Sequence, residues 1–160
     1  MIEIRQTALA EIFHDPGFDA LTDAYEAECG DREVGPKNLQ EGLYVAMEVA
    51  GSLRCFGVWK TVYSSQFSVL SELVGYAFLL IYILPHYGVK IATTESIFVS
   101  QNVRRSGAGT TFKAFLRRYA KAEGCQEFLS SARAGSRYEK VLSRTKNCKR
   151  MSVVYRERLA

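Results

Sequence analysis

The spacing of hydrophobic and polar positions predicts a chain that alternates between helices and strands. Apolar residues recur at helical spacing in some stretches, and other stretches have the β-branched, aromatic composition of a strand. The predicted helices cover residues 8–13, 18–27, 36–50, 110–123 and 136–144. The predicted strands cover residues 2–5, 53–62, 72–84, 90–100, 126–132 and 151–159. This alternation predicts a protein of the α/β (α+β) class.

The most apolar stretch of the chain is Leu73–Leu84, which is too short to cross a bilayer. After Gly75 the run is apolar on both faces of a strand, so we expect it to lie centrally in a sheet that is covered on each side. A polar connection at residues 63–71 separates it from the strand before it. An antiparallel pair joined by this connection is the simplest arrangement.

Residues 91–122 are typical of a strand that passes through a short loop into an amphipathic helix. The loop, residues 104–109, has the sequence RRSGAG. Its glycines let the backbone approach a ligand, and its consecutive amides precede a helix N-terminus. This combination predicts a phosphate-binding site, and therefore a nucleotide-like ligand.

Composition narrows the class of protein. The chain has 160 residues, of which 48% are hydrophobic, and this indicates one soluble domain, which we expect to span residues 1–160. The four cysteines have no C-x-x-C spacing and no nearby histidine pair, so neither a metal site nor a disulfide framework is predicted. The N-terminus lacks a signal-peptide pattern, and no membrane role is implied. A cytoplasmic location is therefore expected.

Charge is distributed unevenly along the chain. Residues 1–103 contain 6 Lys and Arg against 13 Asp and Glu, a net charge of −7, whereas residues 104–160 contain 15 against 4, a net charge of +11. A field of that sign attracts an anionic ligand such as a phosphorylated cofactor or a nucleic acid. A solvated basic face is the alternative. A nucleic acid is the weaker candidate for this ligand. Single-stranded nucleic acids bind to aromatic side chains set among basic ones, and in this sequence the two kinds of residue do not interleave.

The loop and its surroundings resemble one known family. Val99, Arg104, Gly107 and Gly109 fit the pattern V-x-x-x-x-R-x-x-G-x-G, directly after the strand TTESIFV. This is similar to the acetyl-CoA-binding core of the GNAT (Gcn5-related N-acetyltransferase) acyltransferases, whose motif is Q/R-x-x-G-x-G/A. The resemblance covers roughly residues 36–160 and is greatest to members carried by tailed bacteriophages. It implies a single domain with a twisted, mixed, mainly antiparallel sheet and helices on both faces.

The resemblance also implies where acetyl-CoA binds. The amides of Arg105 to Thr110 would bind the cofactor pyrophosphate at the helix N-terminus, and the side chains of Arg104 and Arg105 would add charge-assisted contacts. The backbone of residues 97–99 would pair with the pantetheine arm. The implied cofactor-binding residues are Ile97, Phe98, Val99, Arg104, Arg105, Ser106, Gly107, Ala108, Gly109 and Thr110. A glycine turn that binds no ligand is the alternative.

Acetyl transfer to an amine needs a group that accepts a proton, often through water. Glu95 is the only acid between Lys90 and Gly107, and it lies near the position where relatives often keep a base. Strand alternation places Thr93 and Glu95 on one face, and a half-buried carboxylate there is suited to base catalysis. Glu95 is therefore the candidate base. A strand glutamate paired with a neighbouring arginine is the equally weighted alternative.

The general acid is where the sequence departs from the family. Many relatives carry a tyrosine in a segment of the form F-Y-E-K-x-G-F, whereas the best alignment places Leu142 at that tyrosine and Lys146-Asn147 at Gly-Phe. Tyr138 lies four residues earlier, on the same helical face, and is the candidate substitute. A packed aromatic is the simpler interpretation of Tyr138. Direct attack without a dedicated acid is also compatible with a thiolate leaving group.

Together these features predict an N-acetyltransferase that moves an acetyl or related acyl group from acetyl-CoA to an amine of a protein or small molecule. The acceptor would enter through residues 18–51, 63–71 and 85–88, and the acidic first half favours a basic acceptor. The alternative is a GNAT-fold module that binds CoA or another protein without turnover. The sequence leaves open the acceptor, the acyl group and the oligomeric state, including a homodimer.

Overall fold

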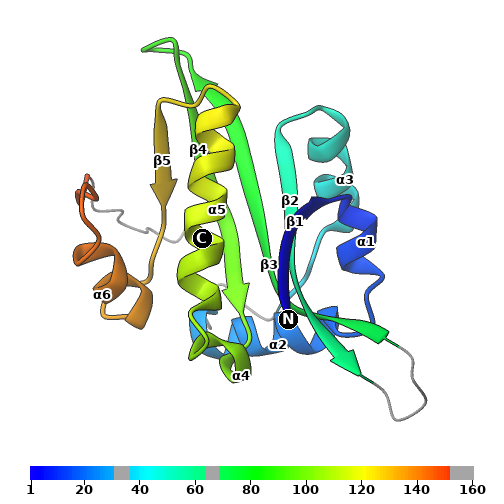
Figure 1. Cartoon of the computed structure of the whole chain (residues 1–160). Coiled ribbons are helices and arrows are strands. Elements are labelled where there is room, and N and C mark those ends of the chain that lie inside the picture. The colour runs from blue at the N-terminus through cyan, green and yellow to red at the C-terminus, as the bar shows by residue number, and fades with distance from the viewer. Residues whose placement is uncertain (31–36, 64–68, 152–160) are drawn as a thin grey trace, which may run out of the picture.

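The computed structural model describes residues 1–30, 37–63 and 69–151 (Figure 1). Helices and strands alternate along the chain. Their order is β1 (Ile2–Thr7), α1 (Leu9–Phe13), α2 (Phe18–Cys29), α3 (Glu41–Val49), β2 (Leu53–Tyr63), β3 (Val69–Leu84), β4 (Val89–Val99), α4 (Gln101–Arg104), α5 (Ala108–Ala122), β5 (Glu127–Ser130) and α6 (Arg137–Ser143).

The five strands form one sheet in the order β1-β2-β3-β4-β5. The pairs from β1 to β4 are antiparallel, whereas β5 pairs with β4 in parallel. The predicted mixed and mainly antiparallel sheet is therefore confirmed. The pairing of β3 with β4 shifts register between Phe78 and Leu79, where Glu95 is the extra residue of β4. Such a bulge bends the strand and changes the direction of the side chains beside it.

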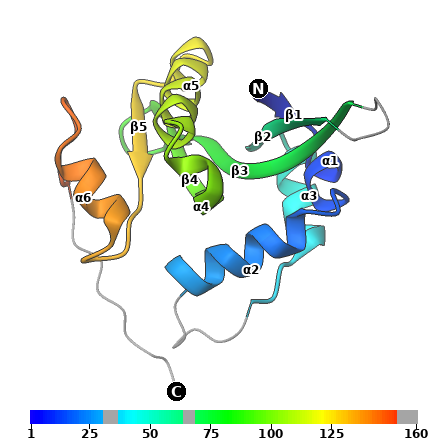
Figure 2. The same cartoon turned by 60° about the horizontal axis from the view of Figure 1, so that its bottom comes forward.

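Helices cover both faces of the sheet, as predicted (Figure 2). On one face α5 packs against the sheet, with Phe112 and Leu116 fully buried. On the other face α1, α2 and α3 surround a second core that contains Phe18 and Phe78. The prediction that β3 is central is confirmed, because Phe78 and its neighbour Leu79 are both fully buried and belong to opposite cores.

Helix α5 forms because its apolar residues recur every four positions. Phe112, Leu116 and Ala120 are almost completely inaccessible to solvent. Burial of a phenylalanine or leucine side chain contributes about 1.5–3 kcal/mol. The helix ends in a left-handed turn at Gly124, where φ is 79°, and the amide of Cys125 donates to the Ala120 carbonyl at 2.9 Å. Gly124 therefore ends the helix.

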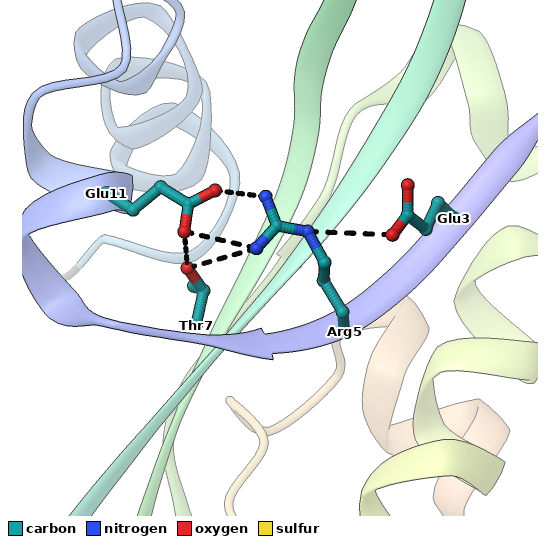
Figure 3. Close-up of polar contacts among 4 residues, drawn as sticks. All are labelled: Glu3, Arg5, Thr7 and Glu11. Atoms are coloured by element: carbon teal, nitrogen blue, oxygen red, sulfur yellow. Dashed lines mark hydrogen bonds and ion pairs between the residues drawn. The ribbon is translucent and has the colours of Figure 1, made fainter.

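A polar cluster fixes β1 to α1 (Figure 3). The Arg5 guanidinium donates to Glu11 and Thr7, and it lies 3.6 Å from the Glu3 carboxylate. These contacts hold the pKa of the Glu11 carboxyl below its usual range, mainly through the hydrogen bond from Arg5. The same guanidinium stacks 4.0 Å above the Trp59 ring, which anchors the cluster to β2.

Helix α3 and strand β3 begin several residues away from their predicted starts. Helix α3 begins at Glu41 rather than at residue 36; Pro36 lies outside the described residues. Leu39 and Leu43 are 38% and 63% exposed, so little packing supports an earlier helical turn. Strand β3 begins at Val69 rather than at residue 72, because residues 69–71 continue the antiparallel ladder with residues 61–63 of β2.

The region after β4 also differs from the prediction. Residues 101–104 form the short helix α4, which the sequence pattern did not indicate, and α5 begins at Ala108 rather than at residue 110. Strand β5 is four residues long, shorter than the predicted range 126–132. Helix α6 agrees with the predicted helix 136–144, with Ser136 as its N-cap. The predicted strand 151–159 lies outside the described residues except for Met151, which is in no strand.

Candidate active site

Strands β4 and β5 separate part of the way along the sheet. Their parallel pairing runs from Ile91 to Thr94 and ends where Thr94 faces Ser130, while β4 stays paired with β3 as far as Val99. Within the described part of the chain, residues 95–99 therefore have a strand neighbour on only one side. Figure 1 shows the short β5 beside the longer β4. The free edge of β4 offers backbone donors and acceptors to an extended ligand.

Glu95 lies at the point where the two strands part. Its side chain is exposed, not half-buried as predicted, because it is the bulged residue of β4. One carboxylate oxygen, Oε1, accepts a hydrogen bond of 3.0 Å from the Tyr44 hydroxyl of α3. The sequence left open an ion pair with a neighbouring arginine. Among the described residues the partner of Glu95 is instead a tyrosine from a distant helix.

Aromatic side chains from three elements surround this position. Tyr25 of α2 packs edge-on against Phe98 of β4 at 6.0 Å between ring centroids, and it lies 6.4 Å from Tyr76 of β3. Burial raises the pKa of the Tyr25, Tyr44 and Tyr76 hydroxyls above the usual value, and the nearby charge of Glu95 raises each further. These phenols therefore stay protonated at neutral pH and act as hydrogen-bond donors.

The loop before α5 is a tight turn. The amides of Ser106 and Gly107 donate to the carbonyls of Val103 and Arg104, each at 3.2 Å. Gly107 has a φ of 83°, a left-handed conformation that favours glycine. It is the N-cap of α5, and no side chain caps the helix. The amides of the first turn, which begins at Ala108, have no acceptor within the helix and are available to an anion.

Gly109, the second glycine of the motif, faces open space. A Cβ atom built on it would meet no other atom within 4 Å. Nothing in the described part of the protein therefore requires a glycine here. A backbone that a ligand approaches closely explains the absence of a side chain. Arg105, which lies within the turn before α5, is exposed.

Arg104 pairs with an acid of α2. Two of its nitrogens, Nη1 and Nη2, bind the Glu28 carboxylate of α2 at 2.7 and 3.0 Å, and its Nε donates to the Val99 carbonyl at 2.6 Å. Gln101 donates to the same carboxylate at 2.9 Å. The hydrogen bond from Arg104 is the main reason that the pKa of Glu28 is below its usual value. Arg104 therefore joins α2 to the loop, and its contact with the cofactor stays a prediction.

Tyr138, the candidate acid, packs against α5. Its ring centroid lies 5.8 Å from the Nζ of Lys113, and its buried hydroxyl has no hydrogen-bond partner in the described part of the chain. Burial raises the pKa of this hydroxyl. Tyr138 thus lies beside Lys113 of α5, and no hydrogen bond between described residues joins it to Glu95.

Three buried polar atoms lack a protein partner in the described structure. They are Ser96 Oγ on β4, Lys113 Nζ on α5 and Tyr138 Oη on α6. Buried polar groups are normally hydrogen-bonded, and an unpaired one often marks a site for a missing partner. Their three elements flank the separation of β4 from β5 (Figure 1). The free strand edge, the uncapped helix and these atoms fit a long, polar, anionic ligand such as CoA.

Sequence reasoning missed two residues of this region. Tyr44 lies in a predicted helix and Glu28 lies next to one. Each is hydrogen-bonded to a residue more than fifty positions away in the chain. Helical spacing shows which face of a helix is apolar, but it does not show which strand that face meets.

Other classes of site find no support in the described part of the protein. No cluster of three or more His, Cys, Asp or Glu side chains is placed to bind a metal ion among the described residues. Of the helices described, none is both long and apolar enough to span a bilayer.

Solved structures of acetyltransferases share this fold. One is the aminoglycoside acetyltransferase meta-AAC0020 from an uncultured soil metagenomic sample, with 18% identity, a TM-score of 0.69 and coverage of 99% of this chain and 96% of that chain. Another is the ribosomal-protein-alanine N-acetyltransferase from Brucella melitensis biovar Abortus 2308, with 16% identity, a TM-score of 0.67 and coverage of 98% and 100%. At these identities the likeness shows the fold alone.

A third solved structure contains a ligand derived from CoA. It is AAC(6')-Iy in complex with the bisubstrate analog CoA-S-monomethyl-acetylneamine, with 19% identity, a TM-score of 0.63 and coverage of 99% of each chain. A search of curated proteins finds no match. The model of the acetyltransferase (GNAT) family matches residues 7–142, which are most of the chain. The chain therefore belongs to the acetyltransferase (GNAT) family.

Proposed function

We propose that this protein is an N-acyltransferase that moves an acetyl or related acyl group from acyl-CoA to a primary amine. The observation that carries the proposal is the arrangement of β4. One strand provides the free edge at residues 95–99, carries Glu95 at the bulge and leads through α4 to the uncapped start of α5. This arrangement supports a donor site and a proton acceptor on the same strand.

The residues that would hold CoA follow from the geometry. The amides at the start of α5, from Ala108 to Thr110, suit the pyrophosphate, and the exposed Arg105 adds positive charge. The free edge of β4 at residues 97–99 suits the amides of the pantetheine arm. When bound, acyl-CoA supplies a thioester whose carbonyl carbon the amine attacks and whose thiolate leaves. Arg104 contributes by fixing the loop through Glu28.

Glu95 is the proposed base. An amine is cationic at neutral pH and attacks only after it loses a proton, which the Glu95 carboxylate accepts directly or through one water. Its Oε1 is held by Tyr44, so Oε2 is the oxygen available to the acceptor. A positioned general base contributes typically about 10²–10⁴-fold to rate.

The leaving thiolate has two possible fates. Tyr138 is the proposed proton donor if it moves from its buried position beside Lys113. Direct departure of the thiolate requires no donor, since a thiol has a pKa of about 8.5. Turnover of Tyr138→Phe separates the two routes: a loss of about ten-fold or more supports the acid role, and unchanged turnover supports direct departure.

The acceptor is proposed to be positively charged. Helix α2 contains Asp19, Asp23, Glu26 and Glu28 and no basic residue, and its Tyr25 contacts the residues beside Glu95. An acidic helix at the acceptor side raises the local concentration of a cationic amine. The names of similar structures include aminoglycoside acetyltransferases, which supports this choice of substrate class.

The test is an acetyl-CoA turnover assay over a panel of amines. The panel contains sisomicin, spermidine, lysine, an alanine-terminated peptide and glucosamine 6-phosphate, and thiol release is measured. We expect turnover with at least one polycationic amine, reduced about 10²-fold or more in Glu95→Gln. Unchanged turnover in Glu95→Gln would show that Glu95 is not the base, although the protein would still be an enzyme.

A second candidate function is a CoA-binding module without turnover. Leu142 at the usual tyrosine position and the buried hydroxyl of Tyr138 favour it. Isothermal titration with acetyl-CoA tests both functions, because each requires saturable binding. Binding without turnover of any amine would favour the CoA-binding module. Absence of binding would contradict both candidate functions.

A further inference from the structure

A single hydrogen bond links the candidate base to a helix on the acceptor side of the sheet. The Tyr44 hydroxyl donates to Glu95 Oε1 at 3.0 Å, across fifty-one positions of sequence. Glu95 is exposed and lies at a bulge, where strand pairing restrains the side chain least. An exposed glutamate normally samples several rotamers, so this hydrogen bond selects one of them.

The ring of Tyr44 is itself held in place. It packs against Phe13 of α1 with centroids 5.7 Å apart and against Phe78 of β3 with centroids 5.1 Å apart. Phe78 is fully buried, and Phe13 stacks on Phe18 at 5.0 Å. The phenol is therefore carried by the core of this face rather than by a mobile surface segment. A donor so fixed can hold a carboxylate in one geometry.

The groups that face Glu95 keep the donor protonated. Burial and the Glu95 charge raise the pKa of Tyr44, and the same two causes act on Tyr25 of α2 and Tyr76 of β3. Among the described ion pairs, none joins Glu95 to a lysine or arginine. The carboxylate is thus bordered by neutral phenols, and its negative charge remains available to a cationic amine.

We infer that Tyr44 is a positioning residue, which holds Glu95 by Oε1 so that Oε2 faces the acceptor amine. The inference rests on the proposed function, since it assigns Tyr44 to the same proton transfer. Tyr44 touches neither the cofactor nor the reacting atoms in this role. It acts through Glu95 alone, so its contribution should vanish when Glu95 cannot accept a proton.

The test is a double-mutant cycle with Tyr44→Phe and Glu95→Gln. Tyr44→Phe removes the hydroxyl and keeps the ring between Phe13 and Phe78. Loss of a hydrogen bond to a charged group predicts a fall in kcat of about ten-fold, with the dissociation constant of acetyl-CoA unchanged. In the Glu95→Gln background the same change should cost less than about two-fold, since the pair acts as a unit. Equal losses in both backgrounds would overturn the inference.

Tyr119→Phe is the matched control. Tyr119 is also half-buried, and its ring packs on Phe56 at 4.8 Å, but it belongs to α5 on the opposite face of the sheet. Its kcat should equal that of the wild type. A comparable loss in Tyr119→Phe would show that any tyrosine hydroxyl of the core affects turnover, and would overturn a specific role for Tyr44.

A second readout does not depend on turnover. Urea denaturation of the same four cycle proteins at pH 7 measures the coupling between Tyr44 and Glu95 directly. We expect the midpoint shifts of the two single variants not to add in the double variant. Additive shifts would refute the hydrogen bond itself. If the wild type acetylates no amine while the coupling is present, the proposed function fails and the contact stands.

Discussion

At the scale of single residues, the two glycines of the loop have different reasons to be glycine. Gly107 has a φ of 83°, which a side chain adopts only with strain. Gly109 lies in the first turn of α5, and a Cβ atom there would meet nothing within 4 Å. One glycine is therefore explained by the backbone, and the other by the proposed approach of a ligand.

This difference gives a prediction for the paired variants Gly107→Ala and Gly109→Ala. Gly107→Ala should lower the free energy of unfolding by about 1 kcal/mol, because its left-handed conformation becomes strained. Gly109→Ala should leave stability unchanged or raise it by about 0.5–1 kcal/mol, as alanine favours a helix. It should nevertheless weaken acetyl-CoA binding, since the new methyl group occupies the ligand's space.

Urea denaturation and isothermal titration with acetyl-CoA check the two variants. The result that contradicts the assignment is normal acetyl-CoA affinity in Gly109→Ala. Gly42→Ala in α3 is the control, because a Cβ atom there also meets nothing within 4 Å and lies away from the loop.

At the scale of elements, the contact between Glu28 and Arg104 joins α2 to the loop between β4 and α5. Both side chains are about 30% exposed, at 29% and 31% respectively. The contact is bidentate, and Arg104 also stacks on Phe98 at 5.0 Å between its central carbon and the ring centroid. Helix α2, which lies on the proposed acceptor side, is thereby attached to the segment that would hold the cofactor.

Glu28→Gln should lower the free energy of unfolding at neutral pH by about 1 kcal/mol, the scale of a partly exposed charged pair. Arg104 holds the pKa of Glu28 below its ordinary value, so this contribution is fully present above the unfolded-state pKa of about 4.3. It is lost as pH falls through the folded-state pKa. The stability difference between wild type and Glu28→Gln should therefore shrink below about pH 4.

Denaturation curves at several pH values from neutral to acidic measure this difference. A difference that stays constant through the acidic range would exclude the charge of Glu28 as its cause. Glu3→Gln is the control, because the Glu3 carboxylate is 63% exposed and its ion pair with Arg5 is long, at 3.6 Å.

At the scale of the whole molecule, the charge asymmetry of the sequence coincides with the division of the site. The acidic helix α2 and the Tyr44 helix α3 cover one face of the sheet, whereas the basic segment after residue 103 includes α5 and α6 (Figure 2). An anionic cofactor and a cationic acceptor would thus meet regions of opposite charge. Long-range attraction of this kind weakens as salt shortens the Debye length.

Raising the salt concentration from about 0.05 M to about 0.5 M should therefore weaken the binding of both ligands. We expect the dissociation constant of acetyl-CoA and the KM of a polycationic amine each to rise several-fold. Titration calorimetry and steady-state kinetics measure the two effects, with denaturation at the same salt concentrations as the control for folding. An acetyl-CoA affinity that does not depend on salt would show that the basic segment does not attract the cofactor.

The sequence by itself determined the sheet, its central strand and the loop. Hydrophobic periodicity is a local property, and so it placed the strand of residues 90–100, the helix at Phe112 and Leu116, and the glycine motif between them. The resemblance to the GNAT family was found in the same stretch of sequence. The loop's candidate binding residues stay predictions, but the backbone around Gly107 and Gly109 agrees with what a phosphate site needs.

Only the tertiary structure decided how Glu95 and Arg104 are used. The bulge exposes Glu95 and pairs it with Tyr44, and the end of α2 binds Arg104 through Glu28. These contacts join segments that are fifty or more positions apart, and local spacing carries no information about such distances. The separation of β4 from β5 at Thr94 is likewise set by strand pairing, which the composition of neither strand reveals.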